Sequence, residues 1–232
     1  MTTYSTHQTH SDAQHIPPLE NGDRLTRLEF ERRYRAMPQI KKAELIEGIV
    51  YMAAALRFRS HGQPHAQLLG WLFNYQIATP GLELSDNATV RLDLDNEPQP
   101  DVALFIDPAL GGQVRISKDD YIEGAPELIA EVAASSASYD LGDKKKAYRR
   151  NGVKEYIVWQ MLDNHLDWFV LQNDDYVNLR PDVDGIIRSR QYPGLWLAVE
   201  ALLAGNIAQV MVVLQQGLAS PEHQKFTQGL AN

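Results

Sequence analysis

The chain has 232 residues, with 22 Lys plus Arg against 30 Asp plus Glu and a formal net charge of -8. This charge excludes a protein that coats nucleic acid by bulk electrostatics, so a nucleic-acid partner would need a local basic strip. The lack of cysteine excludes disulfide frameworks, thiolate metal sites and cysteine nucleophiles. We expect a cytoplasmic protein with no membrane partner, because the sequence shows neither a secretory signal nor an apolar run of roughly 18 residues.

The amino-terminal part combines a polar tail with a short helix. Residues 1–22 are rich in Thr, Ser, Gln and His and cannot bury enough apolar surface to fold, so we expect a disordered tail. From Asp23 onward, apolar residues recur at loosely helical intervals until Pro38 ends the run. This spacing predicts an amphipathic helix whose apolar stripe consists of Leu25, Leu28, Tyr34 and Met37.

A turn signal and a second helix follow. Residues 43–54 alternate apolar and polar side chains around the pair Glu47 and Gly48, which predicts a strand or a hairpin. Residues 65–78 carry apolar side chains at helical spacing and are followed by a proline and a glycine, so we predict a helix there. Its stripe is expected to consist of Leu68, Leu69, Leu72, Phe73 and Ile77.

The middle of the chain predicts neighbouring strands of one sheet. Three extended segments, 82–94, 99–106 and 126–133, are separated by turn clusters. A helix over 141–150 then precedes further extended segments, and this order implies one crossover within a mixed sheet. The further segments are 154–162, 165–172 and 175–179, the last two joined through Asn173 and Asp174.

The carboxy-terminal segment 195–219 is apolar around most of its circumference. We expect it to rest on the core or on a second subunit. The whole pattern predicts an α/β domain over residues 23–196, with a mixed central β-sheet flanked by helices, and a helical extension over 197–232.

Two acidic residues lie inside apolar, strand-like runs. Asp101 opens one run, and Glu131 lies within another, on the face opposite the most apolar row of its strand. Carboxylates in such positions need a partner. One alone would most simply pair with an arginine or cap a loop, whereas two together favour a metal site.

The predicted crossover helix directs a lysine toward the sheet. Leu141, Lys144 and Tyr148 share one stripe of this helix. A basic strip on its flanks and outer side is what an acidic protein would need to bind phosphate. The structural alternative is a lysine stem lying on apolar surface, with a solvated outer face. The strip consists of Lys145, Arg149 and Arg150.

Together these groups have the chemistry of phosphodiester hydrolysis. Carboxylates hold a hard divalent cation, usually Mg²⁺ with Mn²⁺ as a substitute, which polarises the phosphoryl oxygen and activates a bound water. A lysine beside the ion can orient that water and stabilise the charge of the transition state. Tyr148 is expected to position either the lysine or a phosphate.

These residues lie in segments that follow one another in a distinctive order. The segments read AELIEG, QPDVALF and PELIAEVAASSASYDLGDKKKAYRRNGVKEYIVW, with RSHGQPH and TPGLELSDNATVRLD between them. They resemble the Uma-two family of endonucleases, a branch of the PD-(D/E)XK or restriction-endonuclease-like superfamily. The resemblance implies a restriction-endonuclease-like core and a metal-dependent endonuclease that acts on DNA.

The resemblance assigns roles to individual residues. It implies that Asp101 and Glu131 are metal ligands and that Lys144 is the catalytic lysine. Glu44, in AELIEG, would add an acid from the first element of the core. Two further positions complete the implied site, Val132 at the metal and Tyr148 in a Lys-x-x-x-Tyr pairing.

One departure from the wider superfamily concerns the lysine. The superfamily signature is Glu-x-Lys on a strand, whereas Ala133 stands two positions after Glu131 and the lysine lies on the helix. The resembling family shares this migration. Lys146 is the substitute candidate for the catalytic amine.

The histidines suggest a further, weaker site. His61 and His65 have the spacing of zinc ligands, but a glycine and a proline between them disfavour a regular helical turn. His65, or Arg57 and Arg59 ahead of it, could instead touch DNA at the rim of a cleft.

Our leading hypothesis is a magnesium-dependent endonuclease that works as a homodimer, because two sites related by a twofold axis most simply cut both strands of a duplex. The first alternative is a catalytically inactive DNA-binding or regulatory module on the same fold, whose binding would survive removal of Asp101 and Glu131. A second alternative is a structural partner protein, supported by the apolar segment 210–214.

Overall fold

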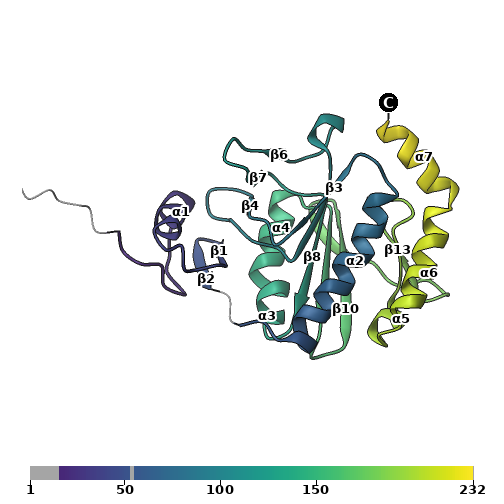
Figure 1. Cartoon of the computed structure of the whole chain (residues 1–232), viewed down its shortest axis with the longest axis horizontal. Helices are drawn as coiled ribbons and strands as arrows, with labels where there is room; N and C mark the ends of the chain where they lie inside the picture. Colours follow the sequence, from purple (N-terminus) through teal and green to yellow (C-terminus); the bar gives the residue numbers. More distant parts are fainter. Residues whose placement is uncertain (1–15, 53–54, 232) are drawn as a thin grey trace, which may run out of the picture.

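A six-stranded mixed sheet forms the centre of the molecule (Figure 1), and the computed structural model describes residues 16–52 and 55–231. The strand order is β11–β10–β9–β8–β5–β3. In this sheet β8 and β9 run parallel and all other neighbours run antiparallel, which confirms the predicted crossover. The strands are β3 (Leu82–Asp86), β5 (Val102–Ile106), β8 (Leu128–Ala133), β9 (Glu155–Gln160), β10 (His165–Gln172) and β11 (Asp175–Asn178).

Helices cover both faces of this sheet (Figure 1). On β8, Ala130 and Val132 pack into the core beneath α2 (Gln63–Ile77). Ile129 points to the opposite core, which includes residues of α4 (Lys145–Asn151). Because strand side chains alternate between faces, Glu131 shares the α4 face, as predicted.

The connection from β8 to β9 contains a π-helical turn. It runs through α3 (Ala137–Tyr139), η3 (Asp140–Lys144) and α4, and ends at Gly152 with a φ of 88°. The helix predicted over 141–150 is therefore present, but its first part is wound more widely than an α-helix. Such single π turns are frequent at functional sites.

The amino-terminal layer has a small core of its own, and residues 1–15 of the predicted tail lie outside the described residues. The predicted hairpin forms, and Glu47 and Gly48 at its turn have φ values of 52° and 71°. Phe30 is buried in this core, whereas Leu28 of the predicted stripe is exposed. The elements are α1 (Arg27–Arg35), β1 (Ala43–Ile46) and β2 (Ile49–Met52).

The buried stripe of α2 differs from the predicted one. Phe73 and Ile77 are exposed, and Trp71 and Tyr75 are buried instead. The polar atoms of these two aromatic side chains have partners inside, since the Trp71 indole donates to the Trp196 carbonyl and the Tyr75 hydroxyl to a proline carbonyl. Satisfied hydrogen bonds allow amphipathic rings to fill the core in place of aliphatic side chains.

The predicted extended segment 82–94 divides between two sheets. The chain turns at Asn87, which has a φ of 54°, so that β3 ends and the chain enters a separate three-stranded sheet. The strands of this sheet are β4 (Val90–Arg91), β6 (Arg115–Ile116) and β7 (Ile122–Glu123). Two short helical turns complete this half of the chain, η1 (Phe58–Gly62) and η2 (Pro108–Leu110).

The carboxy-terminal helices extend the main core. Val210 and Leu214 belong to the same buried cluster as the α2-facing side chains of β8. Within the described residues, no helix combines the length and apolar character needed to cross a membrane. The elements are β12 (Ile186–Arg188), β13 (Trp196–Ala198), α5 (Val199–Leu203), α6 (Ile207–Leu218) and α7 (Pro221–Leu230).

Candidate active site

Asp101 and Glu131 each hydrogen-bond to the backbone of the other's strand. Asp101 Oδ2 accepts a hydrogen bond from the Val132 amide at 2.9 Å, and the Asp101 amide donates to Glu131 Oε2 at 3.3 Å. Both residues are only 3% exposed. The two predicted acids are thus brought together where β5 begins beside β8.

Lys144 reaches the same cluster from the crossover. Its Nζ donates to Glu131 Oε1 at 2.8 Å and lies 2.9 Å from Glu44 Oε1 and 3.8 Å from Asp140 Oδ1. One turn later, the Tyr148 hydroxyl donates to Glu131 Oε1 at 3.0 Å. The buried ammonium group therefore faces three carboxylates.

Glu44 connects the amino-terminal layer to this cluster. It lies on β1, and its Oε1 also accepts a hydrogen bond from the Gln99 amide at 2.7 Å. The four residues predicted as catalytic therefore meet, although they come from β1, the start of β5, β8 and the crossover.

Two residues beside Asp101 were not predicted as parts of the acid cluster. His61 Nε2 lies 3.2 Å from Asp101 Oδ2, and Lys42 Nζ lies 3.5 Å from Oδ1. His65 instead contacts the Asp101 carbonyl and the Asp86 carboxylate. The histidine spacing had singled out His61. Nothing in the sequence distinguishes Lys42 from an ordinary surface lysine ahead of a strand, so its place beside Asp101 could not be predicted.

Asp140 and Tyr139 also lie beside the lysine without having been predicted. The Tyr139 ring centroid is 5.5 Å from Lys144 Nζ, and its buried hydroxyl has no hydrogen-bond partner among the described residues. Asp140 is the first residue of the π-helical turn that ends at Lys144. Tyr139 precedes Lys144 by five residues, which is the spacing of a π turn and not of a regular helix. Asp140 precedes Lys144 by four residues, an ordinary helical spacing from which the sequence could have identified it.

The two central acids have different protonation behaviour. Burial disfavours ionisation of Asp101, but the His61 hydrogen bond and the Lys42 charge outweigh burial and hold the pKa of Asp101 well below its usual range. Burial raises the pKa of Glu131 to about 8 even though Lys144 opposes the shift. Two neighbouring carboxylates with pKa values pushed apart are typical of catalytic sites.

Lys144 is held in its charged form. Burial by itself would lower the pKa of this lysine, but the carboxylates of Glu131 and Glu44 raise the pKa well above its ordinary value. Lys144 therefore carries a positive charge in the folded protein. Burial, followed by the nearby negative charges, likewise raises the pKa of Tyr148, which stays a hydrogen-bond donor.

The remaining predicted lysine lies away from the acids. The Lys146 side chain is exposed and pairs with Asp143 at 3.0 Å. The structure places Lys144 at the cluster and Lys146 on the outer surface of the helix.

The predicted basic strip lies on α4, and each of its three cations already has a partner. The carboxylate that pairs with Arg150 offsets part of the positive charge that a phosphate would meet, whereas the partners of Lys145 and Arg149 carry no net charge. The partners are the ring of Phe169 for Lys145, the Asp174 carbonyl for Arg149 and the Glu47 carboxylate for Arg150.

Comparisons with known proteins agree with this architecture. The family model Uma2, described as a putative restriction endonuclease, matches residues 28–200. The chain belongs to this family. A crystal structure of a putative nuclease belonging to DUF820 from Anabaena variabilis ATCC 29413 is 12% identical, with a TM-score of 0.56 over 75% of this chain and 96% of that one. None of the curated proteins matches the sequence. The Uma2 resemblance and the predicted fold are confirmed.

The donor set of this Uma2 chain fits a hydrated divalent cation. Among the described residues, no three His, Asp or Glu side chains converge as ready-made metal ligands. Asp101 and Glu131 supply carboxylate oxygens, and Mg²⁺ is commonly bound through one or two carboxylates with several waters retained. Val132 has an apolar side chain and donates its amide to Asp101, so it could offer a metal only its carbonyl oxygen.

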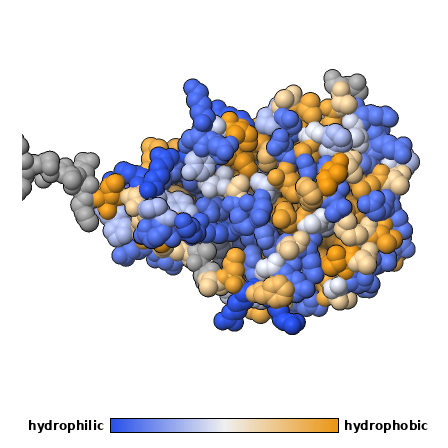
Figure 2. Space-filling model, viewed as in Figure 1, coloured by the Kyte–Doolittle hydropathy of each residue, from blue (hydrophilic) through white to orange (hydrophobic). Residues whose placement is uncertain are grey.

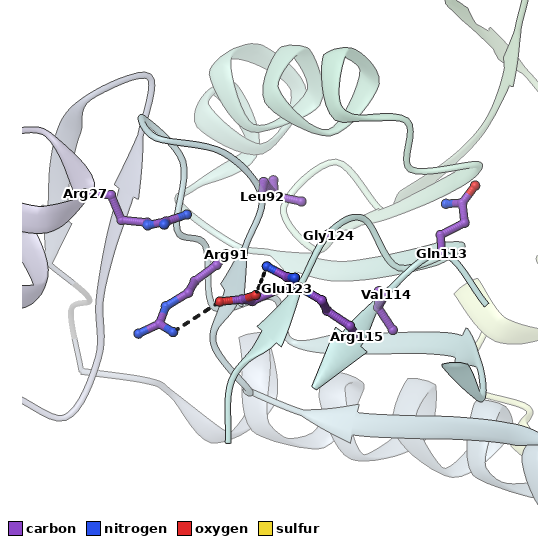
Figure 3. A pocket seen from close by; sticks show the side chains of 8 residues that line it. All are labelled: Arg27, Arg91, Leu92, Gln113, Val114, Arg115, Glu123 and Gly124. Atoms are coloured by element: carbon purple, nitrogen blue, oxygen red, sulfur yellow. Dashed lines mark ion pairs between the residues drawn. The ribbon is translucent and has the colours of Figure 1, made fainter. Parts of the chain in front are cut away.

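A polar hollow of about 350 Å³ lies apart from the acid cluster in this Uma2 structure (Figure 3). Arg91 and Arg115 both pair with Glu123, at 3.6 Å and 2.6 Å, so these cations are neutralised within the chain. Its lining shares no residue with the acid cluster. It consists of Arg27, Arg91, Leu92, Gln113, Val114, Arg115, Glu123 and Gly124.

Proposed function

We propose that this Uma2 protein is a metal-dependent endonuclease that hydrolyses phosphodiester bonds in DNA. The observation that supports the proposal is the meeting of Asp101, Glu131 and Lys144, three charged groups from separate elements, around one buried point. Paired carboxylates with a fixed cation are the groups that phosphodiester hydrolysis requires.

Each residue has a defined task in this proposal. Asp101 and Glu131 would hold Mg²⁺ or Mn²⁺. When bound, such an ion polarises the phosphoryl oxygen and makes a bound water more acidic. Lys144 stays protonated, orients the attacking water and stabilises the negative charge that develops on the phosphoryl oxygens. Tyr148 and Glu44 keep the carboxylate and the ammonium group in place.

A cleavage assay tests the proposal. Wild-type protein is expected to cut DNA with Mg²⁺ or Mn²⁺, and Asp101→Asn to abolish cutting. Lys144→Met should lower the rate by roughly a hundredfold or more, as expected when a group that stabilises transition-state charge is lost. Glu83→Gln, which alters an exposed acid on β3, is the matched control. A wild-type protein that cuts no DNA with either metal would contradict the proposal.

One observation favours a second candidate function, a binding module without turnover. Asp101, Glu131 and Lys144 are all buried and already hydrogen-bonded within the chain. Such a module would bind DNA with strong salt dependence, and Asp101→Asn would leave this binding intact. Fluorescence titrations at two salt concentrations, run beside the cleavage assay, separate the two functions.

We also propose that the protein forms a homodimer. A shallow, open apolar groove of about 500 Å³ lies on the outer face of α6, and Met211, Val212 and Gln215 are among the residues that line it. Figure 2 shows apolar side chains gathered on this side of the molecule. Sedimentation should show a dimer for the wild type and a monomer for Val212→Glu, which places a charge in the groove. A wild-type protein that sediments as a monomer would contradict the proposed homodimer.

A further inference from the structure

An exposed segment of alternating apolar and basic residues precedes α2. It consists of Leu56, Arg57, Phe58 and Arg59, and the side chains of Leu56 and Phe58 are 63% and 71% exposed. Figure 2 shows apolar and hydrophilic side chains next to one another at the lower edge of the molecule, where Figure 1 places the amino-terminal end of α2. Large apolar side chains gathered in solvent mark surfaces that contact a partner.

The two arginines of this segment are free to bind an anion. Neither Arg57 nor Arg59 has an ion-pair or hydrogen-bond partner for its side chain within the described residues. Arg91 and Arg150, by contrast, are held by carboxylates of the same chain. A free guanidinium group is well suited to phosphate, because its planar donors match phosphate oxygens.

The segment leads directly into the acid cluster. The backbone amides of His61 and Gly62 both donate to the Arg57 carbonyl, at 3.0 Å and 3.1 Å. His61 in turn places its Nε2 3.2 Å from Asp101 Oδ2. His61 therefore lies one helical turn after Arg57, and a nucleic-acid backbone held by Arg57 and Arg59 would pass close to the acid cluster.

We propose that Phe58 stacks on an unpaired base of the substrate while Arg57 and Arg59 bind the adjacent phosphates, so that the protein prefers DNA with single-stranded character. This inference rests on the proposed endonuclease function. The acids are buried, and a slim single strand can approach them more closely than a wide duplex. Aromatic stacking accepts every base, and an already unpaired base avoids the cost of unstacking.

Binding measurements on full-length protein test this inference in EDTA, where metal-dependent cutting is suppressed. The probes are a single strand, its matched duplex and a duplex with a short unpaired stretch, each carrying 2-aminopurine. Phe58→Leu keeps the apolar bulk but removes the aromatic face, and should weaken binding of unpaired DNA roughly tenfold while leaving duplex binding unchanged. With this variant, binding should no longer change the fluorescence of the 2-aminopurine in the DNA. Phe73→Leu, at an exposed aromatic residue of α2, is the matched control.

The arginines are tested through salt dependence. Replacing both Arg57 and Arg59 with Gln should reduce the slope of log affinity against log salt by about 1.4 for single strands, whereas Arg180→Gln should leave it unchanged. Wild-type protein that binds and cuts DNA, together with a Phe58→Leu variant that loses nothing, would overturn this inference alone. Binding of the segment to anionic lipid vesicles in place of DNA would also overturn it. Wild-type protein that neither binds nor cuts DNA would overturn the proposed function as well.

Discussion

Lys144 balances the charge of the buried cluster. Its ammonium group faces Glu131, Glu44 and Asp140, and removal of one partner of a buried ion pair leaves the others uncompensated. We expect Lys144→Met to lower the free energy of unfolding by about 3–5 kcal/mol at neutral pH. Urea denaturation measures this loss.

A double variant separates the charge effect from packing. If the loss comes from unpaired carboxylates, Lys144→Met combined with Glu44→Gln should be more stable than Lys144→Met alone, and the amide oxygen can still accept the hydrogen bond from Gln99. Equal or lower stability of the double variant would mean that the lysine stem, and not its charge, stabilises this region.

Glu97 should make stability depend on pH. Burial and then the neighbouring Glu31 raise the pKa of Glu97 from 4.5 to about 8, although Arg91 opposes the shift. The folded state therefore keeps a proton that the unfolded chain releases near pH 4.5, so this contribution to stability is present in acid and is lost as the pH rises to about 8.

Glu97→Gln tests this pH dependence. The neutral amide has no proton to lose, so the variant should exceed the wild type in unfolding free energy by more than about 1 kcal/mol at pH 8. Denaturation at pH 5 and pH 8 measures the difference, with Glu83→Gln as the exposed control. An unchanged pH profile would show that Glu97 is ionised in the folded protein.

At the scale of elements, the hairpin between β10 and β11 offers a clean test of turn conformation. Asn173 and Asp174 both have positive φ, 49° and 63°, a conformation that glycine adopts without a Cβ penalty. Asp174→Gly should raise the unfolding free energy by about 0.5–1 kcal/mol, because the Arg149 bond is to the backbone carbonyl and is kept. Asp175→Gly, within β11, should instead destabilise the protein by a similar amount. Thermal or urea unfolding of the pair shows whether the gain is specific to the turn.

The crossover helix shows why local winding matters for the site. A regular helix predicts Lys144 and Tyr148 on one stripe, and both do contact Glu131. The π turn over Asp140–Lys144 adds the ring of Tyr139, five residues ahead, to the surroundings of the lysine, whereas Asp140 has the i, i+4 spacing of a regular helix. The widened turn therefore places an aromatic ring beside the ammonium group, while its carboxylate neighbours come from β1, β8 and an ordinary helical spacing.

At the scale of the whole molecule, a close approach between α6 and the chain before β13 joins the carboxy-terminal helices to the sheet. A Cβ added at Gly217 would overlap the Gly194 carbonyl oxygen and crowd the Trp196 ring. Gly217→Ala should therefore cost about 1–3 kcal/mol in unfolding free energy, since backbone must shift to admit the methyl group. Gly229→Ala on α7, where nothing lies within 4 Å, should be neutral or slightly stabilising. Equal effects of the two substitutions would show that the two segments are not tightly joined.

The sequence by itself determined the local features of this protein. Alternation identified β8 and the face of Glu131, the turn pairs Glu47–Gly48 and Asn173–Asp174 marked the hairpins, and ordered motifs indicated the family. These features depend on residues that are close together in the sequence, so a short stretch of sequence is enough to identify them.

Only the tertiary structure decided what surrounds each functional group. It brought His61 and Lys42 to Asp101, gave the basic strip of α4 intramolecular partners, and buried Trp71 and Tyr75 through hydrogen bonds to distant carbonyls. These outcomes depend on contacts between residues far apart in the chain. Periodicity shows which side of an element is buried but not which distant group covers it, and the pKa of a carboxylate follows from that distant group.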